Sequence, residues 1–162
     1  TKPSIMKRFL ILTFAIVAFV FSASAQRYST HSLSLRTSYG LEYGYEYKWD
    51  SAISLIGRVG AGSEVYSPYK NNYFIGKGFN VTIEPRYYLN TQDFFSVKVN
   101  NALLIPNTIF KASLVPMYGV KREFTKHWFC EFTIGGGVGY YSGDYGRFFF
   151  EPHLQFRIGF KL

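Results

Sequence analysis

Hydrophobic and polar residues alternate with a period of two over almost the whole chain after Gln26. In the segment 79–89 the odd positions read Phe, Val, Ile, Pro, Tyr and Leu, and the even positions read Asn, Thr, Glu, Arg and Tyr. Successive side chains of a β-strand point to opposite faces, so this period predicts strands that are apolar on one face. The same pattern recurs in the segments 41–49, 53–61, 95–103, 110–120, 128–140 and 148–162.

The connections between these segments indicate how many strands there are. Short polar turns are predicted at 50–51, 90–93 and 125–127. Longer links are predicted at 64–77, 105–109 and 142–147. Short turns alternating with longer loops are typical of bacterial membrane β-barrels, whose strand number is even. We therefore split the region before Asp50 near 38–40, where Leu33 and Leu35 mark an earlier strand. The predicted fold is all-β: an eight-stranded antiparallel up-and-down transmembrane β-barrel.

The two faces of these strands differ sharply in charge. No residue on the apolar faces is charged, although charged residues make up 17 % of the chain. A barrel of about eight strands has a narrow interior filled by side chains, and an unpaired buried charge costs several kcal/mol. We therefore expect the apolar faces to contact lipid and the charged faces to form an interior ion network. Its predicted members are Arg36, Glu42, Glu46, Arg58, Glu84, Arg86, Lys98, Glu131, Glu151 and Arg157.

Three prolines lie inside predicted strands, at Pro85, Pro116 and Pro152. Proline removes a ladder donor, so it is unusual in a paired strand. Because the three occupy matched positions in the fourth, sixth and eighth strands, we interpret them as β-bulges that bend a closed sheet.

The N-terminal residues carry the three parts of a secretory signal peptide. Two basic residues precede an apolar run at 9–21, which is followed by Ala-Ser-Ala at 23–25. The run is shorter than the roughly 20 residues that a spanning helix needs. We expect cleavage after Ala25, which leaves 26–162 as the barrel domain and 1–25 as upstream residues and signal peptide.

Composition and charge exclude several other classes of protein. Aromatic residues make up 20 % of the chain, which excludes a disordered tail, a collagen-like fibre and a coiled coil. The single cysteine, Cys130, excludes a disulfide scaffold and a multi-cysteine metal site, and we predict neither a metal nor a cofactor. The formal charge of +8 includes three basic residues of 1–25, and the other basic residues are scattered. We therefore predict no nucleic-acid partner.

This pattern resembles the small outer-membrane β-barrel family of OmpX and the OmpA membrane domain, within the porin superfamily. The likeness covers 27–162 and includes the ending Phe156-x-Ile158-x-Phe160-x-Leu162, which resembles the C-terminal signal read by the barrel-assembly machinery. Members typically end in Phe, and Leu162 departs from that. The resemblance implies insertion in the outer membrane of a Gram-negative bacterium. It implies as partners the outer-membrane lipid, lipopolysaccharide and the barrel-assembly machinery, and it implies no particular activity.

The residues suited to catalysis form no recognised motif. His31 and Ser32 are neighbours on one strand and so face opposite ways, whereas Glu151 and His153 share a face and are interpreted as an interior hydrogen bond. We predict that the protein is not an enzyme. Three alternatives stay open: a lipid-modifying enzyme of the lipid A acylhydrolase type with His31, His127 or His153 as base, a narrow ion-conducting channel, and a soluble lipid-binding barrel.

The longest predicted link, 64–77, is the candidate surface-binding loop, because function on such scaffolds is concentrated in loops. Tyrosine together with Asn and Ser is also the composition of adaptable binding surfaces. The candidate contact residues are Tyr66, Tyr69, Lys70, Tyr73 and Phe74. We predict an integral outer-membrane barrel with a plugged polar interior and a structural, surface-binding or adhesion role. Its extracellular partner would bind this loop.

Overall fold

The structure is a computed structural model that describes residues 29–36, 40–69, 72–105, 109–142 and 146–162, without the side chains of 65–69 and 72–73. The predicted signal peptide and its cleavage site lie outside these residues, as does Lys70. The described residues form eight strands: β1 (Ser29–Arg36), β2 (Gly40–Lys48), β3 (Ile53–Tyr69), β4 (Asn72–Tyr88), β5 (Asp93–Ile105), β6 (Ile109–Glu123), β7 (Trp128–Ser142) and β8 (Arg147–Lys161).

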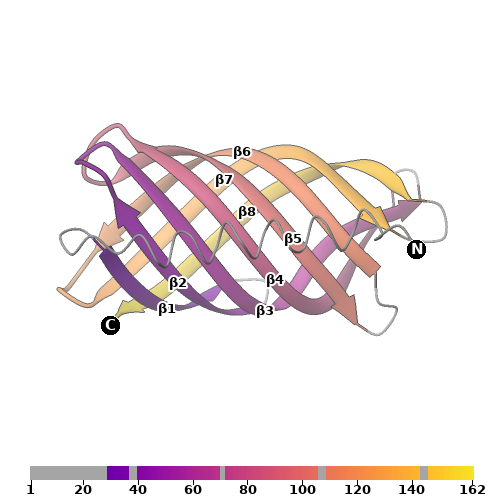
Figure 1. Cartoon of the computed structure of the whole chain (residues 1–162), viewed down its shortest axis with the longest axis horizontal. Coiled ribbons are helices and arrows are strands. Elements are labelled where there is room, and N and C mark those ends of the chain that lie inside the picture. The colour runs from indigo at the N-terminus through magenta and orange to yellow at the C-terminus, as the bar shows by residue number, and fades with distance from the viewer. Residues whose placement is uncertain (1–28, 37–39, 70–71, 106–108, 143–145) are drawn as a thin grey trace, which may run out of the picture.

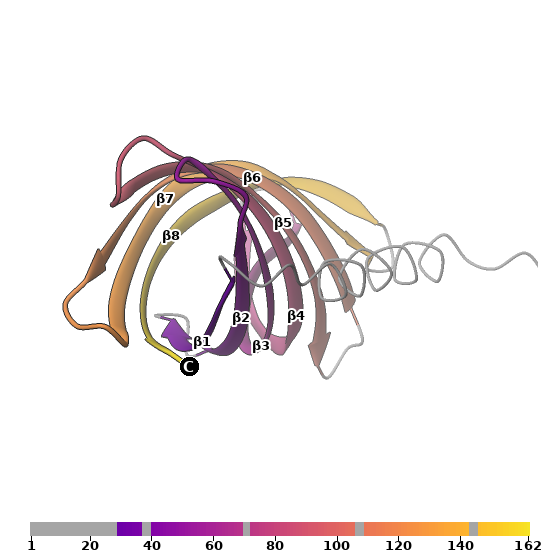
Figure 2. The same cartoon turned by 60° about the vertical axis from the view of Figure 1, so that its left-hand side comes forward.

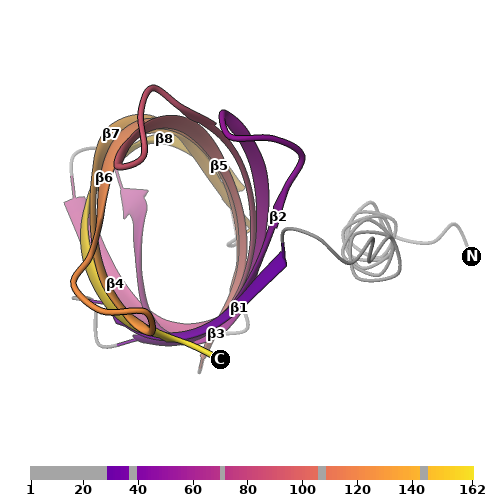
Figure 3. The same cartoon turned by 90° about the vertical axis from the view of Figure 1, so that its left-hand side faces the viewer.

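The strands form one closed antiparallel ring. Each strand pairs with the next one along the chain, and β8 pairs with β1 through five residue pairs, from Ser32↔Lys161 to Arg36↔Arg157 (Figure 3). Figures 1 and 2 show the strands running obliquely around a common axis, as closing a sheet requires. The predicted eight-stranded up-and-down fold is confirmed. Among the described residues, no helix has the length and apolarity needed to cross a bilayer.

Three short turns lie at the end of the barrel that also holds the C-terminus, called here the turn end. In each turn one polar side chain accepts two backbone N–H groups, which is how Asx and Ser/Thr turns replace missing ladder bonds. Asp50 Oδ1 accepts from Ala52 and Ile53 at 2.7 Å. Asn90 Oδ1 and Thr125 Oγ1 do the same for the residues two and three positions after them. The predicted short turns are therefore confirmed. We call the opposite end the hairpin end.

The prediction of a loop at 64–77 is wrong as secondary structure. β3 continues to Tyr69 and β4 begins at Asn72, and their pairing runs on with one register shift between Tyr66 and Tyr69. The physical reason is that β3 and β4 continue to pair with each other beyond the alternating pattern, through a segment rich in aromatic residues, which suit a strand. The segment is therefore a long β3–β4 hairpin extension with a short connection.

The prediction of bulges at the mid-strand prolines is also wrong. The β4–β5 pairing skips Pro85 and the residue before it and then resumes in the same register. The β6–β7 pairing does the same at Pro116, and Pro152 lies opposite Gly136 of β7 in an unbroken register. Proline has no N–H to donate, so each proline costs hydrogen bonds without inserting an extra residue.

The wall has an apolar outer face and a polar inner face. Outward side chains such as Leu35, Leu154 and Phe150 are exposed, whereas the carboxylates of Glu84 and Glu131 are almost completely buried. The prediction that apolar side chains face outward and charged side chains face inward is thus confirmed. Exposed aromatic residues also gather around the short turns: Trp49, Tyr87, Phe124 and Trp128. This arrangement is the reverse of a water-soluble barrel, which keeps its apolar face inside.

Candidate functional site

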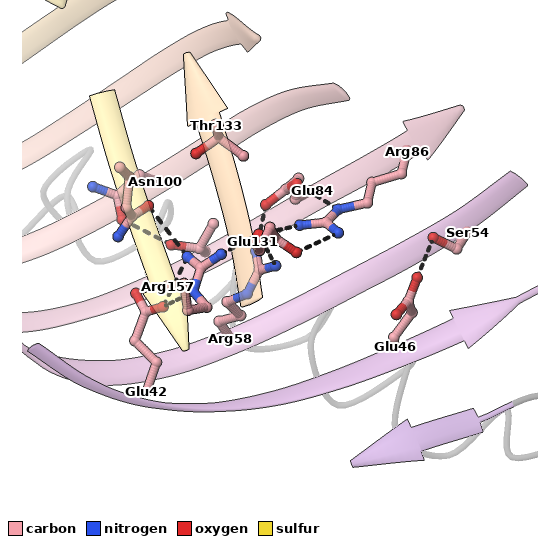
Figure 4. Close-up of polar contacts among 12 residues, drawn as sticks. Glu42, Glu46, Ser54, Arg58, Glu84, Arg86, Asn100, Glu131, Thr133 and Arg157 are labelled. Atoms are coloured by element: carbon pink, nitrogen blue, oxygen red, sulfur yellow. Dashed lines mark hydrogen bonds and ion pairs between the residues drawn. The ribbon is translucent and has the colours of Figure 1, made fainter. Parts of the chain in front are cut away.

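The charged inner face is the most distinctive site of the molecule. Its side chains come from all eight strands. Figure 4 shows part of this face, where Arg86 and Arg157 point toward the carboxylate of Glu131. The side chains of this face form three groups that follow one another along the axis, which we call the central, hairpin-end and turn-end clusters.

The central cluster is built around the carboxylate of Glu131 on β7. Arg86 binds it in a bidentate manner, with Nη1–Oε2 and Nη2–Oε1 distances of 2.7 and 2.8 Å. Arg157 donates to Oε1 of the same carboxylate, and Arg58 approaches it at 3.5 Å. Glu84 pairs with Arg58 and, at 2.6 Å, with Nε of Arg86. Two carboxylates are therefore shared among three guanidinium groups.

The hairpin-end cluster joins β1, β2, β3, β6 and β8. Arg36 lies 3.3 Å from Glu42 and 2.8 Å from Glu64, while Lys111 lies 3.3 Å from Glu64 and 2.8 Å from Glu151. Glu42 also accepts from Nε of Arg157 at 3.0 Å, which links this cluster to the central one. The amides of two asparagines add hydrogen bonds to the carboxylates of Glu64 and Glu42.

The turn-end cluster surrounds the carboxylate of Glu46. It accepts from Ser54 at 2.9 Å, from the Tyr88 hydroxyl at 2.8 Å and from Lys121 Nζ at 2.9 Å. Phe94 is fully buried beside it, with the Arg86 guanidinium 3.9 Å from its ring centroid. This distance suits a cation–π contact. An aromatic side chain therefore closes the polar interior toward this end.

All ten predicted interior residues are buried, and all of them except Lys98 make an ion pair with another described residue. The sequence reasoning missed Glu64, which it placed in the loop, together with Lys111 and Lys121. The available signal was parity: each of them continues the inward register of its strand. The alternating pattern predicted that Tyr88 faces inward, but it did not reveal that its hydroxyl donates a hydrogen bond to Glu46.

The histidines lie in three separate settings. His31 faces outward, and its Nδ1 is hydrogen-bonded to the Tyr43 hydroxyl. His153 is buried inside and contacts Thr133 Oγ1 at 3.0 Å, so its partner is not the predicted Glu151. His127 stacks on Phe160 at the turn end. Within the described ranges, no group of three or more His, Cys, Asp or Glu residues is arranged to hold a metal.

The candidate surface-binding residues are only partly described. Phe74 of β4 is exposed, although its parity is that of the inward residues of this strand. Tyr66 and Tyr69 belong to β3 and Tyr73 to β4, but only their backbone is described. The binding role of this segment stays a prediction.

Cavities lie on both sides of the wall. The interior holds one of about 20 Å³ that Glu46 and Lys121 line, and one of about 80 Å³ that Lys98 and Glu151 line. A larger outward hollow of about 700 Å³ lies where Pro85 and Pro116 interrupt the ladder.

Comparison with known proteins supports the fold. No family model matches the chain, and no curated protein matches it. The chain is similar in structure to the N-terminal β-barrel domain of Pseudomonas aeruginosa OprF, with a TM-score of 0.51 and 12 % sequence identity. The likeness covers 83 % of this chain and 95 % of that one. With 12 % sequence identity, this likeness shows that the two proteins share a fold.

Proposed function

We propose that the chain is an integral outer-membrane β-barrel protein of a Gram-negative bacterium, exported through a signal peptide cleaved after Ala25. The observation that carries the proposal is the contrast between the two faces of the wall. Spanning strands need an apolar outward band and internally satisfied backbone groups, and a closed barrel supplies both. The aromatic residues around the short turns suit a membrane interface, where amphipathic rings concentrate.

The role we propose is structural or surface-binding, with the interior acting as a plug. Wide aqueous channels belong to barrels of about 16 strands, whereas eight strands leave room for little more than side chains. The shared carboxylates of the central cluster fit this role because they tie β3, β4, β7 and β8 together across the axis. The β3–β4 hairpin is the proposed contact surface for an extracellular partner.

The first experiment is a heat-modifiability test on residues 26–162 refolded in detergent. A closed barrel resists detergent until boiled, so unboiled and boiled samples are expected to migrate differently on a gel, with β-rich circular dichroism. Identical migration together with solubility in plain buffer would contradict the membrane barrel and favour a soluble lipid-binding barrel.

Two further measurements separate the other roles. Planar-bilayer recordings are expected to show no steady ion current, because the central cluster fills the axis. Alanine substitution of each histidine, followed by mass analysis of lipid A from the host, is expected to leave lipid A unchanged. A steady current or an altered lipid A would replace the plugged barrel with a channel or an enzyme.

A further inference from the structure

The outward hollow follows a step in the outer face of the wall, where β4, β5 and β6 change from large to small side chains. The level nearer the turn end holds residues that face one another in register from β3 to β7: Ile53, Tyr87, Phe95, Tyr118 and Ile134. The next level toward the hairpin end holds Pro85, Val97 and Pro116. All eight residues line the hollow. Because proline and valine extend less far from the backbone than tyrosine and phenylalanine, the second level is the floor and the first level is the side wall.

The outward lining of the hollow is apolar. The three floor residues are exposed, and Phe95 of the side wall packs edge-on against Tyr118 with ring centroids 5.5 Å apart. The Tyr118 hydroxyl is hydrogen-bonded to Asp93, the first residue of β5, so it points toward the turn end and leaves its ring against the hollow. The rest of the lining comes from within the wall, at Gly135 and at the inward-facing Arg86, Ser96 and Met117. The volume of about 700 Å³ falls within the about 300–1,000 Å³ of ligand sites.

The hollow climbs from the turn end to the middle of the wall. Ile53 is the first residue of β3, whereas Ile134 is the seventh residue of β7. From β3 to β7 there are four inter-strand spacings, about 19 Å in all. With strands tilted by about 35–45°, a row across them climbs by about 11–13 Å. One leaflet contributes about 15 Å of the hydrocarbon core, so the hollow covers most of one leaflet and ends near the midplane.

Aromatic side chains mark both ends of the hollow. At the turn end, Trp49 is 55 % exposed and its backbone N–H donates to the carbonyl of Ile53 at 3.1 Å. The two residues therefore lie side by side, at the level where membrane interfaces concentrate tryptophan. At the far end, a Cβ on Gly136 would lie 2.7 Å from Cζ of Phe150, so the Phe150 ring covers the residue that follows the lining. The hollow is open toward the headgroups of one leaflet and bounded before it reaches the other.

We infer that the outward hollow binds one acyl chain of a phospholipid from the leaflet at the turn end, with the headgroup beside Trp49 and the methyl end of the chain at Gly135. A chain lying along the step contacts the floor and the side wall at once, which increases its dispersion contacts over those on a smooth wall. The apolar outward lining offers no partner to a charged ligand. Short turns of such barrels face the periplasm, so the leaflet concerned is the inner one. This inference rests on the proposed membrane barrel, so its test reports barrel closure separately.

The test is native mass spectrometry of residues 26–162, refolded in detergent and titrated with dipalmitoyl phosphatidylethanolamine. We expect a one-to-one complex that saturates. Dipalmitoyl phosphatidylglycerol, which has the same chains and a different headgroup, is expected to bind within twofold. Dihexanoyl phosphatidylethanolamine, whose chains are too short to reach β6, is expected to bind at least tenfold more weakly.

Two substitutions fill the floor of the hollow. Val97→Trp places an indole on it from β5, and Pro116→Phe places a ring on it from β6 while restoring an N–H to the ladder. Each is expected to weaken lipid binding at least fivefold. The matched control is Val138→Trp on β7, because Val138 is 55 % exposed on the outer face and does not line the hollow. This control is expected to change binding less than twofold.

Four results would each overturn the inference: lipid binding without saturation, a tenfold preference for one headgroup, unchanged binding in both floor variants, or an equal loss in the control. A lipid-free dimer that both floor variants dissociate would also overturn it, by assigning the hollow to a second copy of the chain. The heat-modifiability shift is recorded for every sample. A missing shift counts against the barrel, and a missing lipid complex with the shift present counts against the hollow as a lipid site.

Discussion

Glu131→Gln removes the charge at the centre of the interior while keeping the size and shape of the side chain. Three guanidinium groups lose one shared anion, and the amide nitrogen that replaces one oxygen can no longer accept from them. Removing one partner from a buried ion pair costs about 3–5 kcal/mol, because the remaining charge stays buried. Arg58 and Arg86 retain Glu84, and Arg157 retains Glu42. We therefore expect a loss near the lower limit, about 3 kcal/mol.

The assay is equilibrium unfolding by urea in lipid vesicles, followed by the gel-mobility shift between folded and unfolded forms. With an m-value of about 2 kcal/mol/M, a loss of about 3 kcal/mol lowers the midpoint by about 1.5 M. The matched control is Glu123→Gln, whose carboxylate is half-exposed and lies 2.5 Å from Lys161 Nζ. Exposed pairs contribute about 0–1 kcal/mol, so the control midpoint should stay within about 0.5 M.

One result would refute the reasoning about the interior. If Glu131→Gln and Glu123→Gln shift the midpoint equally, the central cluster is screened as well as a surface pair, and the interior is hydrated. In that case the plug proposal fails, because a hydrated interior offers a path for ions.

Three further predictions concern packing, the lipid face and one hydrogen bond. Gly119→Ala would place a Cβ against the edge of the Phe94 ring, closer than van der Waals contact allows, so we expect it to lower the urea midpoint and Phe94→Leu in the same chain to restore part of the loss. Ile134→Arg, midway along β7 on the outer face, is expected to cost about 2–4 kcal/mol of folding free energy in vesicles, whereas Phe124→Arg at a short turn should cost about 0–1 kcal/mol. Equal costs would contradict the lipid-facing assignment. Tyr88→Phe removes a buried hydrogen bond to Glu46 and should cost about 1.5–3 kcal/mol in the same unfolding assay, while an unchanged midpoint would show that water replaces the hydroxyl.

The strands and their faces could be predicted because both depend on local pattern. Each residue's parity decides whether it faces in or out, and parity needs no knowledge of the partner strand. Short turns such as that at Asp50 were equally readable, since one polar side chain closes each of them. The prediction of where β3 ends and β4 begins was wrong. Tyrosine, serine and asparagine occur in loops and in strands alike, and pairing between the two strands decides between them.

The partners inside the barrel could not be predicted from the sequence. Glu64 meets Lys111 across the axis, and Arg157 meets Glu42 from 115 residues away. Such pairs depend on how the strands tilt and how far each is shifted against its neighbour, and the alternating pattern contains neither quantity. For the same reason the sequence could not reveal that Lys98 is the cation without an ion pair.

The charged interior also determines the order in which the molecule can assemble. An open sheet entering a bilayer would present the Arg, Lys and Glu side chains of its inner face to hydrocarbon, at about 2.5–3.5 kcal/mol for each Arg or Lys on an insertion scale. Pairs between neighbouring strands, such as Arg58 with Glu84, can form before closure, but pairs such as Arg157 with Glu42 form only when β1 meets β8. These two strands lie more than 100 residues apart in sequence and close the ring through five residue pairs. Strand-by-strand entry is therefore unfavourable, and insertion has to coincide with closure. A catalyst that holds the first and last strands together until the ring closes would remove this barrier.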